Sequence, residues 1–324
     1  MNQYLQQHLK SLGFASPQCV TGRASIASVY AKGKRCGIYV LVFDDGEVYA
    51  GQAVDVTRRY VQHSKTYDDI QTLYFQRVAK ARLNEVERDV IQALEREGYH
   101  LRNITFTSLP KGESDFDLVM APSEQQAWLV GRAEKQIAGP RVNDDALRRK
   151  YERKFQQLSQ MPNYEDAEAV LRTFVRKTIP VPAQSEVSFW ACSCLPGFAS
   201  KSIKLYSRIN INWQEVMTVY TEAGQLYVSI HLAASPLQAA YGKSLFRLRL
   251  RHPRLKIIEH QYPSGGQDQI NLKVKGLKAA NALMANPHVV QAAKLFNLRL
   301  MQKGPCNSGR NHCLALADRL LDLA

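Results

Sequence analysis

The stretch from residue 38 to residue 52 most strongly limits how this chain can fold. Residues 38–43 are rich in isoleucine, tyrosine, valine and phenylalanine, and a second run of this kind covers residues 48–52. Between the two runs lies Asp44-Asp45-Gly46, a tripeptide typical of tight turns. The pattern therefore predicts an antiparallel β-hairpin.

The residues that follow the hairpin predict helices and one more strand. Residues 55–64 and 84–96 have helical patterns, and residues 72–78 form a plausible third strand. In the second helix, valine, isoleucine and leucine recur at helical spacing, and Gly98 closes the element. We expect residues 35–115 to form a small antiparallel sheet flanked by helices, which is an α+β module.

The N-terminal residues 1–34 predict a helix and a lead-in to this module. Residues 1–5 lack the charged start and apolar run of a secretory signal. Leu5, Leu9 and Leu12 instead predict a short amphipathic helix that ends at Gly13. No stretch approaches the roughly 20 consecutive apolar residues that cross a bilayer. From these patterns we expect a cytoplasmic protein that does not bind membranes.

The second half of the chain predicts a helical connector, residues 116–178, and a basic α+β domain, residues 179–324. We expect Asn143 to cap a connector helix that begins with Asp144 and Asp145. Ile179-Pro180-Val181-Pro182 interrupts the helical pattern and predicts the domain boundary. Beyond it, the patterns predict strands at 187–192, 206–212, 225–232 and 245–251, and helices at 277–284, 289–296 and 313–323.

The charge distribution favours a polyanionic partner for this second half. The chain has a net charge of +14 and a pI of about 9.5. Residues 1–115 contain 15 Lys and Arg against 13 Asp and Glu, whereas residues 116–324 contain 28 against 16. The excess of +12 in the second part indicates a nucleic acid or an anionic surface as its ligand. Six cysteines are too few for a disulfide scaffold, so we expect them to be reduced.

Two tripeptides and five later residues carry the strongest functional signal. Gly37-Ile38-Tyr39 lies on the first predicted strand and Tyr49-Ala50-Gly51 on the second. The following helix contains Arg58 and Arg59, with His63 one turn after Arg59. The set continues with Glu87 on the second helix and ends with Asn103. In this order and on these elements, the residues resemble the GIY-YIG nuclease family over residues 35–110.

The resemblance implies a fold, an activity and a role for each residue. Tyr39 would be the general base, Tyr49 would position water or phosphate, and Arg59 and His63 would complete the catalytic set. Glu87 would bind one Mg²⁺ or Mn²⁺. The supporting residues would be Gly37, Gly51, Arg58 and Asn103. The chain departs from the family pattern at Ala50 and Asp55, and its hairpin loop is short, but no catalytic group is missing.

The residue types also suit phosphodiester hydrolysis on chemical grounds alone. The attacking water must lose a proton, and the pentavalent phosphorus gathers negative charge. Arg59 offers a rigid, permanently charged fork for a phosphate oxygen, and its i+4 spacing places His63 on the same helical face. A single carboxylate, Glu87, suits Mg²⁺ that keeps several waters. Taken singly, each residue would equally suit aromatic packing or a solvated surface.

Residues 246–251, Phe-Arg-Leu-Arg-Leu-Arg, suggest where nucleic acid could bind. As a strand, this alternation would place three arginines on one face. We expect that stripe, extended by two later cations, to contact DNA phosphates. The set is Arg247, Arg249, Arg251, Arg254 and Lys256. A basic helix face at residues 148–154 more often remains solvated.

The cysteines of the second half offer a weaker possibility. Cys192 and Cys194, with Cys306, His312 and Cys313, could surround zinc. Their spacings match no standard zinc finger, and free cysteine often packs as a small hydrophobe. We therefore favour packing over zinc binding.

Together these patterns predict a divalent-metal-dependent endonuclease for double-stranded DNA, with the C-terminal domain anchoring the substrate. We favour restriction or anti-phage defence over repair and mobile-element roles, because the C-terminal part resembles no repair or homing protein. Duplex cleavage by a single-site module would need a homodimer or two successive nicks. Two alternatives stay open. One is a degenerate, non-catalytic DNA-binding or regulatory protein, and the other is a nuclease gated by a ligand-sensing or partner-sensing C-terminal domain.

Overall fold

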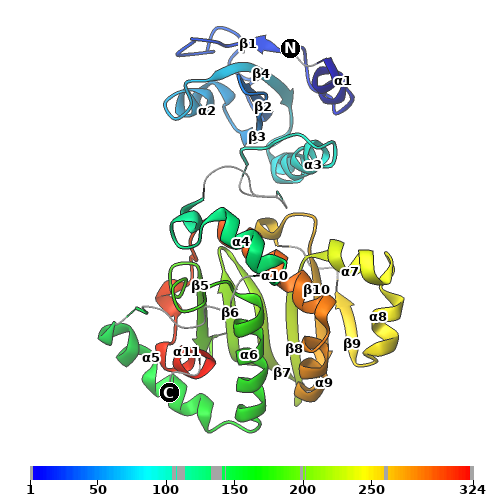
Figure 1. Ribbon diagram of the computed structural model, residues 1–324. Coiled ribbons are helices and arrows are strands. Elements are labelled where there is room, and N and C mark those ends of the chain that lie inside the picture. The colour runs from blue at the N-terminus through cyan, green and yellow to red at the C-terminus, as the bar shows by residue number, and fades with distance from the viewer. Residues whose placement is uncertain are drawn as a thin grey trace. The chain divides into compact units, whose positions relative to one another are not determined.

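The computed structural model describes residues 3–103, 107, 114–132, 141–142, 144–197, 200, 202–258 and 262–321. The chain divides into two compact units, residues 1–107 and 108–324. Both units combine helices with an antiparallel sheet, so the predicted α+β class is confirmed (Figure 1).

The first unit is built on a four-stranded antiparallel sheet in the order β1-β4-β2-β3. Its strands are β1 (Gln18–Cys19), β2 (Gly37–Phe43), β3 (Val48–Ala53) and β4 (Ile70–Arg77), and its helices are α1 (Gln3–Ser11), α2 (Val56–His63), the 3₁₀ turn η1 (Lys80–Arg82) and α3 (Leu83–Arg96). The predicted hairpin is β2 and β3, which pair from Gly37↔Ala53 to Val42↔Val48. The sequence did not predict the short strand β1.

Alternation along β2 explains why helices cover both faces of this sheet. Ile38 and Val40 point into one apolar cluster, which contains Leu5 and Leu9 of α1 and the apolar stripe of α3. Tyr39 points into the other, with Val20 and the α2 residues Val56 and Tyr60. Because successive strand residues face opposite sides, Tyr39 lies on the face that α2 covers, and α3 lies on the other face.

The second unit is built on a six-stranded antiparallel sheet in the order β5-β6-β7-β8-β10-β9. Its strands are β5 (Trp190–Cys194), β6 (Ile203–Ile211), β7 (Gln214–Glu222), β8 (Gln225–Leu232), β9 (Leu255–Ile258) and β10 (Ile270–Lys275). Its helices are α4 (Pro122–Leu129), α5 (Asp145–Ser159), α6 (Tyr164–Thr178), α7 (Ala234–Tyr241), α8 (Phe246–Arg251), α9 (Leu277–Met284), α10 (Pro287–Gln302) and α11 (Leu314–Leu321), with 3₁₀ turns η2 (Asp115–Leu118), η3 (Pro263–Gly265) and η4 (Gly309–Asn311).

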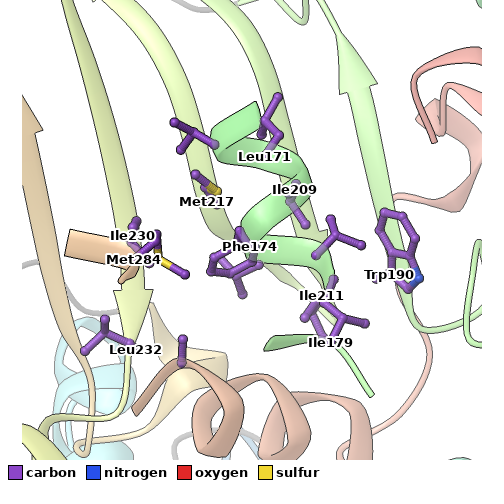
Figure 2. Close-up of a cluster of buried hydrophobic side chains, with 14 of the residues drawn as sticks. Leu171, Phe174, Ile179, Trp190, Ile209, Ile211, Met217, Ile230, Leu232 and Met284 are labelled. Atoms are coloured by element: carbon purple, nitrogen blue, oxygen red, sulfur yellow. The ribbon is translucent and has the colours of Figure 1, made fainter. Parts of the chain in front are cut away.

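One large apolar core holds the second unit together. Figure 2 shows Leu171 and Phe174 of α6 beside sheet residues such as Ile209 and Ile230. Phe174 and Ile230 are both fully buried. Helices α6, α9, α10 and α11 contribute to the same cluster. Such a core is large enough to hold the unit together without disulfides or metals.

The residues that we predicted as a connector are part of this core. Helix α6 packs against α9 and α11 and supplies Phe174 and Val175 to the cluster. The prolines do end the helix, but they do not mark a boundary. Ile179 is buried, and the indole N–H of Trp190 donates to the carbonyl of Pro182 at 2.8 Å. Proline breaks a helix in a linker and in a core alike, so the sequence pattern could not separate the two.

The strand predicted at residues 245–251 is wrong, because the segment forms the short helix α8. Arginine and leucine favour helices, and the segment contains no β-branched residue. Only Leu248 of the helix is buried. The sheet edge that a strand could have joined is occupied by β9, which pairs with β10. Local helix propensity therefore prevails over the alternating pattern.

Smaller differences concern element ends and missed strands. Asn143 lies outside the described residues, and the N-cap of α5 is Asp144, whose side chain accepts from the Leu147 N–H at 2.9 Å. The strand predicted at 187–192 begins later, at Trp190. The sequence patterns did not predict β7, β9 or β10. Among the described residues, no helix is long and apolar enough to cross a membrane.

Candidate active site

Two tyrosines of the β2–β3 hairpin form the floor of the candidate site. Tyr39 pairs with Gly51, and Tyr49 lies two residues before Gly51 on the same face. The two tyrosine rings stack at 6.2 Å between centroids. A methyl group at Gly51 would lie 2.5 Å from the Tyr39 hydroxyl oxygen. Glycine is therefore required here, because the two rings cover this backbone position.

Helix α2 brings the arginine and the histidine to these rings. The Asp55 carboxylate starts the helix by accepting from the backbone N–H of Thr57 at 2.9 Å and of Arg58 at 3.3 Å. Asp55, where the chain departs from the family pattern, is thus the helix cap. The Arg59 Nε–H donates to the Tyr39 hydroxyl at 3.3 Å, and the His63 ring lies 4.8 Å from the Tyr49 ring.

A short polar contact joins Tyr39 to His63. The Tyr39 hydroxyl and His63 Nε2 are 2.7 Å apart. Burial, assisted by the nearby charge of Arg59, lowers the pKa of His63 to about 4. The ring is therefore neutral at pH 7 and can accept a proton at Nε2. Burial and the neighbouring Tyr49 raise the pKa of Tyr39, although Arg59 opposes the shift.

Hydrogen bonds along the outer edge of β3 hold Asn103 and Glu87 in position. Three outward N–H groups of this edge strand need acceptors. The Val48 N–H donates to the His100 carbonyl at 2.8 Å, and the Ala50 N–H donates to Asn103 Oδ1 at 2.9 Å. The Asn103 amide also donates back to the Ala50 carbonyl at 2.6 Å. Asn103 thus extends the ladder as a strand would, which explains its place at the end of the module.

Glu87 of α3 provides the third acceptor along this edge. Its Oε1 accepts from the Gln52 backbone N–H at 3.1 Å, and its Oε2 accepts from the Gln52 side-chain amide at 3.0 Å. Among the residues that the structure describes, no cation lies within ion-pair distance of Glu87. Burial raises the pKa of Glu87, while Gln52 and, more weakly, the charge of Arg59 lower it. The carboxylate is half-buried, held in place and not neutralised, which fits a metal ligand.

The structure therefore brings the five predicted catalytic residues close together, namely Tyr39, Tyr49, Arg59, His63 and Glu87. The supporting residues Gly37 and Arg58 differ in their roles. Gly37 is needed sterically, because a methyl group there would lie 1.9 Å from the Gln76 carbonyl oxygen. Arg58 points away: its side chain is 88% exposed, and it makes a 4.0 Å ion-pair contact with Asp55. Arg58 does not belong to the cluster.

Gln52 is the site residue that sequence reasoning missed. Besides holding Glu87, its side-chain amide donates to Asn84 Oδ1 at 2.6 Å. The available signal was its position directly after Gly51 on an edge strand, where a free N–H must find an acceptor. A glutamine there attracts no attention without knowledge of which strand lies at the edge.

A second acidic group in the first unit surrounds an arginine. Asp44, Asp45 and Asp69 lie close enough to hold a metal. The Arg102 guanidinium is 2.8 Å from Asp45, 2.7 Å from Asp69 and 2.8 Å from Glu47, and it stacks on the Phe43 ring at 3.6 Å. Arg102 therefore holds these carboxylates together and offsets part of their charge.

The cysteine and histidine residues considered for zinc have other contacts. The Cys192 N–H donates to His312 Nδ1 at 3.1 Å, and His312 Nε2 lies 2.9 Å from Glu186 Oε1. Both ring nitrogens therefore already have protein partners. Cys194 hydrogen-bonds to Cys313, and the Cys306 thiol contacts the Asn210 carbonyl at 3.6 Å. These contacts agree with packing inside the core.

The five cations predicted to contact DNA lie together on α8 and at the start of β9, in the second unit. All five are exposed. They do not form the predicted stripe on a sheet face, because α8 is helical and directs its arginines around its axis.

No family model matches the chain, and neither a curated protein nor a solved structure matches it.

Proposed function

We propose that this chain is a divalent-metal-dependent DNA endonuclease of the GIY-YIG type. The observation that carries the proposal is the meeting of a tyrosine–histidine hydrogen bond, an arginine and a carboxylate without a cationic partner. Each is a group that phosphodiester hydrolysis needs: a proton acceptor, a phosphate ligand and a metal ligand.

The Tyr39–His63 pair supplies the path for the proton. Its raised pKa leaves Tyr39 protonated at neutral pH, so the tyrosine cannot act as a preformed phenolate. It can accept a proton from the attacking water only while passing its own proton to a neighbour. Neutral His63, at 2.7 Å, is that neighbour. The Arg59 N–H donates to the Tyr39 oxygen and so leaves the Tyr39 O–H to point at His63.

Arg59 and Glu87 supply the electrostatic part of the mechanism. Arg59 is exposed to solvent, and its fixed fork suits a phosphate oxygen beside Tyr39. Glu87 would hold one Mg²⁺ or Mn²⁺, which supplies positive charge to the phosphate and leaving oxygens when bound. Gln52 orients Glu87 through two hydrogen bonds, and hydrogen bonds of this kind commonly fix the position of metal ligands.

We further propose that the second unit anchors double-stranded DNA and that the protein acts in restriction or anti-phage defence. The cationic residues of α8 and β9 support the anchoring role. One site cuts one strand, so a double-strand break would require a homodimer or two successive nicks.

Plasmid nicking with Mg²⁺ or Mn²⁺ tests the proposal. We expect Glu87→Gln and Arg59→Gln to lower the nicking rate at least about 100-fold, because each removes charge stabilisation of the transition state. Glu85→Gln is the matched control: Glu85 lies on the same helix, is exposed and forms an ion pair with Arg82 at 3.3 Å. We expect it to change the rate less than about threefold.

The non-catalytic alternative has its own result in the same assay. A wild-type protein that binds duplex DNA but nicks it with neither metal would be a DNA-binding or regulatory protein. Equal loss in the Glu85 and Glu87 variants would show that the site has been misplaced.

A further inference from the structure

Helix α8 and the residues beside it carry positive charge that no acidic side chain of the described residues pairs with. Six cations on α8 and the residues beside it are exposed, and none forms an ion pair with another residue in the described part of the chain. We call them the α8 cations: Lys243, Arg247, Arg249, Arg251, Arg254 and Lys256. Uncompensated charge at this density repels itself, so it indicates an external anion.

The same helix holds two large apolar side chains out of the core. Phe246 is 60% exposed and Leu250 is 66% exposed, and their i,i+4 spacing places them on one side of the helix. Leu245 and Leu248 are buried and anchor the segment from the other side. The helix therefore presents an apolar pair amid the α8 cations. In Figure 1, α8 lies beside α7 and β9 at one edge of the six-stranded sheet.

Helix α5 shows that a basic helix in this unit need not face a ligand. Arg148 pairs with Asp318 at 2.6 Å. The ammonium groups of Lys150 and Lys154 donate to the carbonyls of Arg310 at 3.1 Å and Leu195 at 3.4 Å. Much of the basic face of α5 is thus used inside the second unit. The α8 cations have no such contacts among the described residues, which singles out α8.

We infer that α8 is a wedge for duplex DNA: its arginines and lysines contact phosphates, and Phe246 with Leu250 pack against a base step and unstack it. This inference rests on the proposed DNA substrate. Proteins that distort duplexes insert one or two apolar side chains between base pairs, flanked by cations that bind the backbone. Phe246 and Leu250 match this number of side chains, whereas helices that lie on membranes usually present a larger apolar face.

The test measures DNA binding by the full-length protein in EDTA, which prevents metal-dependent cleavage. The probe is a 30-base-pair duplex with 2-aminopurine, whose fluorescence rises when its neighbours unstack. We expect wild type to raise the signal, and Phe246→Ala/Leu250→Ala to abolish the rise and weaken binding about tenfold. Arg247→Gln/Arg251→Gln should weaken binding at least about tenfold and reduce the slope of log K against log salt by about 2.

Matched controls separate the wedge from general effects. Trp213→Ala removes another exposed apolar side chain of the second unit, and Arg149→Gln/Arg153→Gln removes the same charge from α5. We expect each to bind and unstack the duplex within about twofold of wild type. An unchanged far-UV circular dichroism spectrum would show that every variant is folded.

Two results would overturn the wedge while leaving the nuclease intact. One is an unaltered 2-aminopurine signal and affinity in Phe246→Ala/Leu250→Ala. The other is loss of binding to vesicles of phosphatidylserine in the α8 variants with wild-type DNA binding, which would make α8 a membrane contact. Failure of the proposed function has a different signature, since the wild type would then nick plasmid DNA with neither Mg²⁺ nor Mn²⁺, whether or not it binds the duplex.

Discussion

Both units contain arginine, histidine and glutamate side chains near one another. In the second unit the glutamate is paired with cationic groups, whereas in the first unit it is not. In the second unit, Glu186 is fully buried and accepts from both ends of the Arg141 guanidinium at 2.6 and 2.7 Å, and His312 lies at 2.9 Å. Asp318 accepts from the third guanidinium nitrogen of Arg141 at 2.5 Å and also pairs with Arg148 at 2.6 Å. In the first unit, Glu87 receives only neutral donors from Gln52.

This difference distinguishes the ion-pair network around Glu186, which stabilises the fold, from the candidate metal site at Glu87. Despite burial, Arg141 and His312 lower the pKa of Glu186, whereas burial raises the pKa of Glu87. A carboxylate whose charge is satisfied within the protein stabilises the fold. One that stays half-buried without a cation costs stability, and an external cation can supply what it lacks.

Neutralising each carboxylate tests this comparison most strongly. We expect Glu186→Gln to destabilise the second unit by about 3 kcal/mol, since it breaks a buried ion pair and leaves Arg141 undercompensated. Urea unfolding followed by tryptophan fluorescence measures this effect, because Trp128, Trp190 and Trp213 all lie in the second unit.

Glu87→Gln is the opposite arm of this experiment. We expect it to leave the first unit as stable as wild type or slightly more stable, because the charge it removes is unfavourable in the metal-free protein. Hydrogen exchange of the β3 amides reports on this unit. The comparison between the units would fail if both variants lost similar stability.

Gly51→Ala tests whether the tyrosine pair must stay where it is. The new methyl group would collide with the Tyr39 hydroxyl at 2.5 Å and with the Tyr49 ring at 2.9 Å. We expect nicking to fall about 100-fold and the first unit to lose about 2 kcal/mol. Gly197→Ala is the control, because no neighbouring atom lies within 4 Å of the added carbon, and it should change neither the nicking rate nor the stability. A fully active Gly51→Ala would show that the Tyr39 position is not critical.

The sequence predicted the first unit well because its signals are local. The hairpin from β2 to β3 depends on alternation and a turn, and Arg59 and His63 share a face through helical spacing alone. Whether Glu87 reaches that face, however, depends on β3 being an edge strand whose Gln52 N–H lacks a strand partner. The order of strands in a sheet is a long-range property that no local pattern contains.

The second unit was harder to predict for the same reason. The alternation in residues 246–251 suits a strand, but neighbouring strands decide whether a strand can form, and β9 occupies the edge. The prolines near residue 180 end a helix wherever they occur, so only the packing of Ile179 shows that the chain remains in the core there. Patterns that depend on a partner elsewhere in the chain led to the wrong predictions.

Gln52→Ala tests the missed residue and has a smaller expected effect. It removes the side-chain bonds to Glu87 and Asn84 but leaves the backbone N–H that also holds Glu87. We expect the metal concentration for half-maximal nicking to rise about tenfold with little change in maximal rate. A titration with Mn²⁺ measures this shift. A loss of maximal rate at saturating metal would instead assign Gln52 to the transition state.

The smallest effect concerns the titration of His63. Because its pKa falls from the ordinary 6.5 to about 4, the unfolded chain binds a proton at His63 between these pH values and the folded chain does not. The stabilisation from neutral His63 is therefore complete above pH 6.5 and is lost as the pH falls towards 4. With screening by solvent, we expect a loss of about 1 kcal/mol in the first unit.

Hydrogen exchange of the β2 amides should show this dependence of stability on pH in wild type and not in His63→Gln. Identical slopes would mean that the pKa of His63 is the same in the folded and unfolded chains, so that burial does not hold the ring neutral.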